Sequence, residues 1–149
     1  MKMNDVKQEW KGFFSYMEGY DAIEQYKKVS FTMEIIIIDN IFEGISIDSE
    51  SENAFNEPAT VKGFIDEAKM SFIMKYPCAY FKDNHGKMIL DHSTKHPDIH
   101  YLGFFDDTKT QITGNWEMTV YEERYGYDYL EDVLNGDFEM RRTNQNSIW

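Results

Sequence analysis

The sequence has few of the residues that cross-link a chain or carry it through a membrane. It contains one cysteine, Cys78, so it forms no intramolecular disulfide and has no group of cysteines for zinc. Its longest aliphatic run, residues 35–38, falls far short of the roughly 20 residues that span a bilayer. Residues 1–12 are polar and charged and lack the apolar core of a secretory signal. We therefore expect a protein of the reducing cytoplasm that does not enter a membrane.

Basic residues are also scarce. The 149 residues include 15 Lys and Arg against 27 Asp and Glu, which gives a net charge of −12. This sign argues against a nucleic-acid partner, because affinity for the phosphate backbone comes from Lys and Arg. Aromatic residues make up 16% of the chain, which is too many for a disordered acidic tail. The length predicts one domain over residues 1–149 with a sizeable apolar core.

The apolar segments are short and rich in β-branched and aromatic residues, which favours strands over helices. The three prolines, Pro58, Pro77 and Pro97, all fall between these segments. We predict eight strands, at residues 10–18, 29–38, 41–48, 60–66, 69–76, 99–105, 111–120 and 136–142.

A weak internal repeat accompanies these strands: glycine recurs with a large apolar residue two positions before it and another two positions after it. The repeat is centred on Gly12, Gly63, Gly103, Gly114 and Gly136, and Gly44 is an imperfect further case. Residues two apart in a strand share a face, so each glycine lies on the apolar face. The missing side chain lets the sheet coil tightly or lets another backbone approach. Glycines that merely mark turns would not show this flanking pattern.

The connections between the predicted strands are of two kinds. Asp39 with Asn40, Glu67 with Ala68, and residues 106–110 are short enough for hairpins. Consecutive strands joined in this way predict a mainly β protein, an eight-stranded antiparallel up-and-down barrel. Three longer segments are candidates for a functional role, because long loops in compact domains often hold functional residues. They are residues 19–28, read as one or two helical turns, the polar residues 77–98, and the acidic, tyrosine-rich residues 121–135 with a short helix at 127–134.

This pattern resembles the small calycin-type barrels, the group that includes lipocalins, fatty-acid-binding proteins and avidins. More narrowly, the phrase Gly136-Asp137-Phe138-Glu139-Met140-Arg141-Arg142 and the glycine-plus-aromatic strands are similar to those of small uncharacterised bacterial proteins. In lipocalins a tryptophan near the first strand packs against a basic residue near the last. The resemblance implies that Trp10 and Arg142 play these roles, although here the tryptophan precedes its glycine instead of following it.

All four histidines lie close together in the sequence, at His85, His92, His96 and His100, near Asp91, Asp98 and Cys78. Imidazole and carboxylate groups suit zinc, and the spacing of His92 and His96 would align both on one helical face. Pro97 weakens this hypothesis because it disfavours helical geometry at His96. The alternative is a solvated polar loop without a metal.

Other chemistry finds little support in the sequence. Residues 48–52 alternate acidic side chains but lack the spacing of a calcium loop, which favours a solvated acidic face. The acidic residues Glu122, Glu123, Asp128, Glu131 and Asp132 show no identifiable catalytic pair. No GxSxG, HExxH or phosphate-binding loop occurs, and Cys78 has no neighbouring base. These motifs therefore give no support for catalysis or a cofactor, and they leave the question of an enzyme open.

Aromatic side chains on the glycine-bearing faces are the remaining candidates for a site. If these faces point inward, the rings either line an apolar pocket or fill a solid core. The candidate ligand-binding residues are Trp10, Phe14, Tyr16, Tyr101, Phe105, Trp116, Phe138 and Arg142.

Three functions are consistent with these features. The first is a non-catalytic barrel that binds a small apolar or aromatic ligand. The second is an acidic interaction module, such as an immunity or inhibitor protein, that docks on a basic protein. The third is an enzyme that uses a metal in the histidine loop. The sequence leaves the oligomeric state open.

Overall fold

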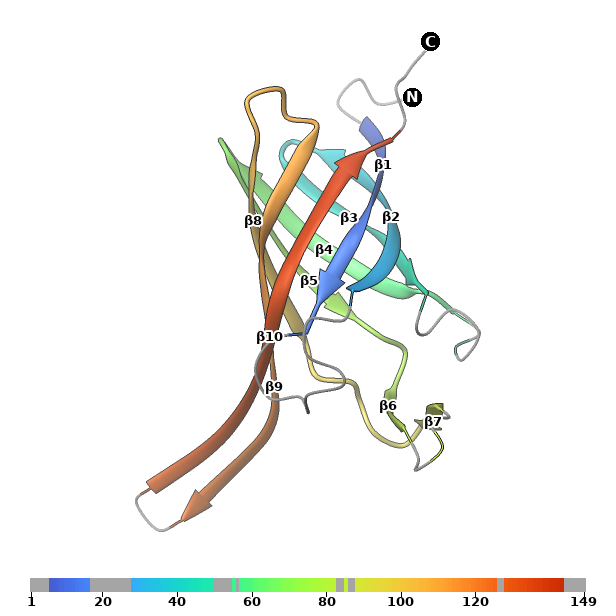
Figure 1. The fold of residues 1–149 in the computed structure, drawn as a ribbon, viewed down its shortest axis with the longest axis vertical. Helices are drawn as coiled ribbons and strands as arrows, with labels where there is room; N and C mark the ends of the chain where they lie inside the picture. Colours follow the sequence, from blue (N-terminus) through green and yellow to red (C-terminus); the bar gives the residue numbers. More distant parts are fainter. Residues whose placement is uncertain are drawn as a thin grey trace.

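A computed structural model describes residues 6–16, 28–49, 55, 57–82, 85, 88–125 and 128–143. Eight strands form a closed barrel in the order β1-β10-β9-β8-β5-β4-β3-β2, and every neighbouring pair is antiparallel (Figure 1). The prediction of an eight-stranded antiparallel up-and-down barrel is therefore confirmed. The strands are β1 (Val6–Ser15), β2 (Lys28–Ile38), β3 (Ile41–Asp48), β4 (Ala59–Asp66), β5 (Lys69–Lys75), β8 (Ile99–Phe105), β9 (Gln111–Tyr125) and β10 (Asp128–Arg142).

Side-chain alternation explains how these segments close on one core. Along β2, every second residue is buried, from Val29 to Ile37, while the residues between them are exposed or half-buried. The same period of two runs through β4, β5 and β8, because successive side chains of a strand point to opposite faces. The interior is therefore apolar over most of its length.

The glycines stand where one strand of the barrel passes close to the next, as the repeat predicts. A Cβ atom on Gly136 would lie 1.7 Å from the carbonyl oxygen of Ser15 on β1. A Cβ atom on Gly12 would lie 1.9 Å from the carbonyl oxygen of Glu139 on β10. No side chain fits at these distances, so glycine permits the tight coiling that joins the first strand to the last.

The short connections have the backbone of tight hairpins. Asp39 and Asn40 both have positive φ angles, 53° and 69°, as a two-residue turn between twisted strands requires. Glu67 opens the β4–β5 turn with a φ of 56°. At the β8–β9 loop, the carboxylate of Asp106 accepts hydrogen bonds from the backbone N–H groups of Thr110 and Gln111, at 3.0 and 3.2 Å.

Two of the longer segments differ from the predictions. Residues 77–98 contain a separate hairpin, β6 (Ala79–Lys82) and β7 (Met88–Asp91). The helix expected at 127–134 is wrong, because β10 begins at Asp128 and pairs with β9 along this stretch, with a bulge between Asp132 and Val133. Aromatic and β-branched side chains favour such pairing over a helix.

The helical turns expected at 19–28 fall almost wholly on residues 17–27, outside the described part of the chain. Lys28, the last of the ten, belongs to β2. The described residues contain no helix, and accordingly none that is long and apolar enough to cross a bilayer.

The two ends of the barrel are built differently. At one end, the turn end, lie the β2–β3, β4–β5 and β8–β9 connections, at the top of Figure 1. At the other, the loop end, strands β3 and β5 run into longer connections, and the β9–β10 ribbon extends past the barrel wall (Figure 1). The loop end is therefore where the long connections expected to carry function converge.

Candidate functional site

The aromatic residues proposed as a ligand site all point into the barrel. Trp10, Phe14, Tyr16, Tyr101, Trp116 and Phe138 are buried, and Phe105 is half-buried against the same core. Their rings contact one another near the turn end, near the loop end and in the middle of the barrel. Near the turn end, the ring centroid of Trp10 lies 6.2 Å from that of Phe105. Phe14, Tyr16 and Trp116 pack edge to face near the loop end, with centroids 5.7–6.3 Å apart.

The middle of the barrel is filled by rings. Tyr101 stacks on Phe72 with centroids 4.7 Å apart, and the edge of Phe138 meets both rings, at 5.1 and 6.1 Å. Phe42 closes on Phe72 from another strand at 6.1 Å. These contacts favour the solid core over the hollow pocket, because a ligand at this level would have to displace rings already packed against one another.

Trp10 and Arg142 lie opposite each other, as the resemblance to lipocalins implies. They are Cα partners in the β1–β10 register. The indole of Trp10 is fully buried and donates a hydrogen bond from Nε1 to Oε1 of Gln8 at 3.0 Å, while Arg142 is half-buried. The pair thus lies at the turn end, and its part in ligand binding stays a prediction.

The histidines do not form a metal site in the described part of the chain. No group of three or more His, Cys, Asp or Glu side chains there is placed to hold a metal ion. His85, His92 and His100 are exposed, whereas His96 is buried. Asp91 is used within its own turn, where hydrogen bonds from the hydroxyls of Ser93 and Thr94 lower the pKa of its carboxyl group.

A polar cluster that the sequence analysis missed lies inside the barrel at the loop end. Asp48 and Ser46, on the inward face of β3, are 4% and 3% exposed. The hydroxyl of Tyr76, the residue after β5, donates a hydrogen bond to Oδ2 of Asp48. Asp48 is the one buried carboxylate among the described residues, and it is held by a phenol from a strand two positions away around the barrel.

Two further rings cover Tyr76. Phe55, in the β3–β4 connection, stacks on it with centroids 5.7 Å apart and an interplanar angle of 24°. His96 approaches the edge of the same ring, at 4.9 Å. Burial lowers the pKa of His96 against opposing effects from the Pro97 carbonyl and Asp98. The neutral imidazole is therefore favoured, and we call Ser46, Asp48, Phe55, Tyr76 and His96 the loop-end cluster.

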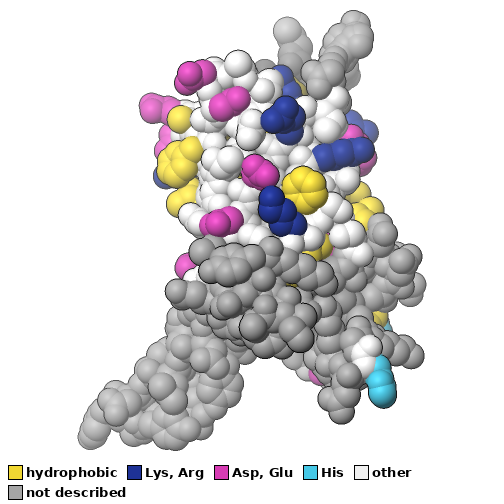
Figure 2. Space-filling model, in the orientation of Figure 1, with side chains coloured by type: hydrophobic (Ala, Val, Ile, Leu, Met, Phe, Trp, Pro, Cys, Tyr) yellow, Lys and Arg dark blue, Asp and Glu magenta, His cyan; other side chains and the backbone are white. Residues whose placement is uncertain are grey.

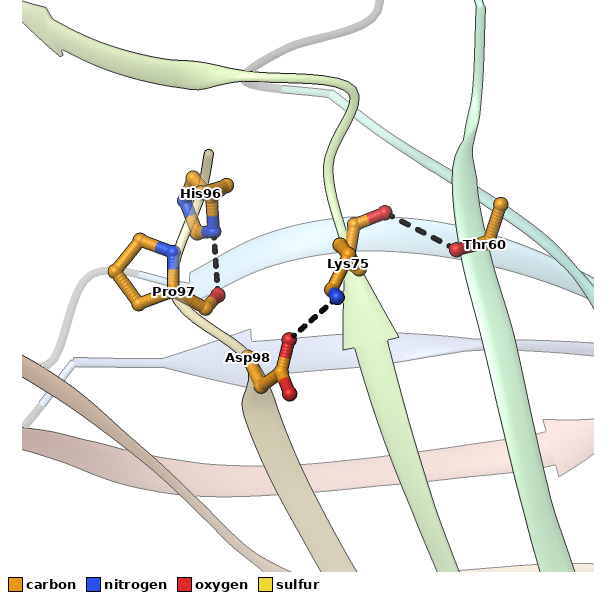
Figure 3. Close-up of polar contacts among 5 residues, drawn as sticks. All are labelled: Thr60, Lys75, His96, Pro97 and Asp98. Atoms are coloured by element: carbon orange, nitrogen blue, oxygen red, sulfur yellow. Dashed lines mark hydrogen bonds and ion pairs between the residues drawn. The ribbon is translucent and has the colours of Figure 1, made fainter. Parts of the chain in front are cut away.

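Polar contacts tie the segment that carries His96 to the strand that leads into Tyr76 (Figure 3). Nδ1 of His96 donates to the carbonyl oxygen of Pro97 at 2.7 Å. Nζ of Lys75 pairs with Oδ1 of Asp98 at 3.1 Å, and the hydroxyl of Thr60 on β4 approaches the carbonyl oxygen of Lys75 at 3.5 Å. The segment before β8 thus contacts the end of β5, which is itself bonded to the start of β4.

The prediction of a solvated acidic face at residues 48–52 is wrong for Asp48. The signal that could have corrected it is strand parity: Phe42, Gly44, Ser46 and Asp48 share one face of β3, and Phe42 is buried. Residues 50–52 lie outside the described part of the chain. Parity places Asp48 inside, but the sequence does not show that Tyr76 would meet it, since that contact joins residues 28 positions apart.

Comparisons with known proteins add one similarity of fold. No protein-family model matches the sequence, and no curated protein matches it. The crystal structure of rhizavidin superposes on this chain with a TM-score of 0.49 and 14% sequence identity, covering 95% of this chain and 86% of that one. At this identity and TM-score the superposition assigns no ligand, and the narrower resemblance to small bacterial proteins stays a prediction.

Proposed function

We propose that this protein binds a small molecule at the loop end of the barrel, with the Asp48–Tyr76 pair as its polar anchor. The observation that carries the proposal is a buried carboxylate, hydrogen-bonded to a phenol, in an otherwise apolar interior. Burying a charged or polar group costs free energy even when it is partnered. A barrel that only had to fold would be at least as stable with apolar residues there, so such a group points to a function.

The chemistry of the cluster defines a ligand class. Asp48 acts as an acceptor toward Tyr76, and its carboxylate oxygens can accept further hydrogen bonds, so the polar group of the proposed ligand is an N–H or O–H donor. The half-buried ring of Phe55, stacked on Tyr76, offers an apolar surface, which suits an aromatic or apolar body. The proposed ligand is therefore a small, largely apolar molecule with one donor group. Because rings fill the middle of the barrel, we place it at the end and not along the axis.

Native mass spectrometry of the purified full chain, compared with its denatured mass, tests for a ligand retained from the cell. We expect an added small mass on the native chain that is lost on denaturation. The variant Asp48→Asn should reduce its occupancy at least about tenfold, the effect of losing one charged hydrogen bond. Asp66→Asn makes the same change on an exposed residue at the turn end and should leave the occupancy unchanged. Equal loss in both variants would contradict the proposed location.

A pair of probes tests the donor requirement. Indole and benzofuran have nearly the same shape, but only indole has an N–H donor. Titrations followed by NMR should show indole binding more tightly, with its largest shifts at the loop end. The preference should disappear in Asp48→Asn and persist in Asp66→Asn. Tighter binding of benzofuran, or shifts confined to the outer wall, would count against the anchor.

A second function is favoured by one feature, the ribbon formed by the outer parts of β9 and β10. Figure 1 shows it extending away from the barrel, and among the described residues its backbone around 119–133 pairs only within the ribbon. Residues 121–132 contain five acidic side chains and one arginine. An isolated two-stranded ribbon is marginally stable in water, and a basic protein surface would complement its charge.

This second function predicts a partner that binds more weakly as salt increases. A full-length chain in which Glu122, Glu123, Glu131 and Asp132 are replaced by their amides should lose that salt dependence in pull-downs at 50 and 300 mM salt, conditions that bracket the screening length of about 10 Å. An unchanged partner and an unchanged salt dependence would remove the ribbon from consideration.

A further inference from the structure

Large apolar side chains are exposed on one side of the outer barrel wall. Strands β2, β3, β4 and β5 lie side by side there. The exposed residues on them include Ile41 at 66%, Ile36 at 47% and Phe64 at 46%, together with Ile38, Ile45 and Ile73. We call these six side chains the outer apolar patch. The wall formed by β1 and β10 mixes acidic, basic and some apolar side chains, as Figure 2 shows for the face turned to the viewer.

The strand register arranges this wall in rows that cross the four strands. The middle row reads Ile36, Glu43, Lys62 and Ile73 from β2 to β5. The row toward the turn end reads Ile38, Ile41, Phe64 and Ser71, and the row toward the loop end reads Glu34, Ile45, Thr60 and Lys75. Acidic side chains therefore lie on β2 and β3, and basic ones on β4 and β5.

A two-fold axis that runs between β3 and β4, parallel to the strands, would make this wall complementary to itself. Such an axis brings β3 of one copy against β4 of the other, since an isologous interface pairs each residue reciprocally. Glu43 would then face the partner's Lys62. Ile41 would face the partner's Phe64.

From this symmetry we infer that the protein forms a homodimer through the outer apolar patch. The six side chains expose on the order of 500 Å² of apolar surface, which is toward the upper end of the largest apolar patches found on monomeric proteins. A standard interface buries about 800 Å² on each partner. The charged and polar members of the rows supply the rest, with Glu43 and Lys62 of the middle row on either side of the two-fold axis. A partner of one charge sign would leave either the two glutamates or the two lysines facing like charge, so a second copy fits best.

Sedimentation equilibrium of the full chain over a range of concentrations tests this inference. We expect a dimer, weakened at least about tenfold by Ile41→Thr, since the most exposed side chain of the patch is removed without a change in the core. Glu43→Lys and Lys62→Glu should each weaken it, and the two changes together should restore it. Phe13→Thr alters a residue that is 45% exposed on β1 and should have no effect.

The orientation has its own readout. In a mixture of methyl-labelled and unlabelled chains, isotope-filtered NOE spectra should connect the Ile41 methyl groups to the ring of the partner's Phe64. A chain that is monomeric throughout would overturn the inference. So would a dimer that Ile41→Thr and Glu43→Lys leave intact, or one without this cross-peak. Far-UV circular dichroism of each variant separates loss of the dimer from loss of the fold.

Discussion

The two ends of the barrel interior are filled by different kinds of side chain. At the turn end, the connections are tight, and the fully buried side chains include Trp10, Ile112 and Met140. At the loop end, the interior side chains include Asp48, Ser46, Tyr76 and His96, which are buried but polar or amphipathic. The barrel interior is thus closed at the turn end by the apolar plug, the side chains of Trp10, Ile112 and Met140, and at the loop end by the hydrogen-bonded loop-end cluster. We attribute stability mainly to the turn end and the proposed function to the loop end.

The largest expected effect comes from breaking the apolar plug. Trp10→Ala removes a side chain that is 0% exposed and packs on Phe105. It should lower the free energy of unfolding by about 3–5 kcal/mol, through lost burial and the cavity left behind. Phe104→Ala, at the same end but 55% exposed, should change it by no more than about 0.5 kcal/mol. Urea unfolding measures both, and equal costs would contradict a core at this end.

The next effect concerns backbone contact near the loop end. The carbonyl oxygen of Ser15 accepts a hydrogen bond from Nε1 of Trp116 at 3.1 Å, and a Cβ atom on Gly136 would stand 1.7 Å from that oxygen. Gly136→Ala should therefore cost about 1–3 kcal/mol or more. Gly103→Ala meets side-chain carbons first, at 2.6 and 2.8 Å, which move more easily than backbone. If Gly103→Ala proved the costlier of the two in urea unfolding, the backbone argument would fail.

A smaller effect should distinguish the polar end by its pH dependence. Burial lowers the pKa of His96 in the folded protein below its usual value of 6.5, so the unfolded chain binds a proton more readily than the folded one. Stability should therefore fall as the pH drops below about 6.5 toward the lowered value. In His96→Phe this contribution is absent, and its stability should fall less between pH 7 and 5. Parallel curves for the two proteins would show that His96 does not titrate in this way.

The smallest effect belongs to the ion pair beside the cluster. Lys75 and Asp98 are 49% and 44% exposed, and exposed pairs contribute about 0.2–1 kcal/mol. A double-mutant cycle with Lys75→Met and Asp98→Asn should give a coupling energy in this range that declines as salt is added. A coupling energy above about 2 kcal/mol would mean that this ion pair, and not the buried loop-end cluster, is the main contact that stabilises the loop end.

The barrel itself was predictable because its signals are local. Alternating burial along β2, the positive-φ pair Asp39 and Asn40, and the glycine positions each follow from residues near one another in the chain. The helix proposed at 127–134 failed because the pairing with β9 that makes this segment a strand lies outside the segment itself. Strand propensity depends on such tertiary partners.

The candidate site was predicted only in part, for the same reason. The aromatic positions face inward as expected, since parity alone places them. The contact between Asp48 and Tyr76 depends on where two strand ends meet in space, and an isolated acidic segment such as 48–52 is more often solvated than buried. The segment 77–98 was expected to matter, and it does bring His96 to Tyr76, although no metal group forms among its described residues.

The most direct test of the account is a crystal structure of the full chain purified under native conditions and at near-neutral pH. The account predicts electron density for a small molecule at the loop end, with a donor atom within hydrogen-bond distance of Oδ1 or Oδ2 of Asp48. Density for a molecule bound elsewhere, or no density beside Asp48 at the loop end, would contradict the proposal that this end binds a ligand.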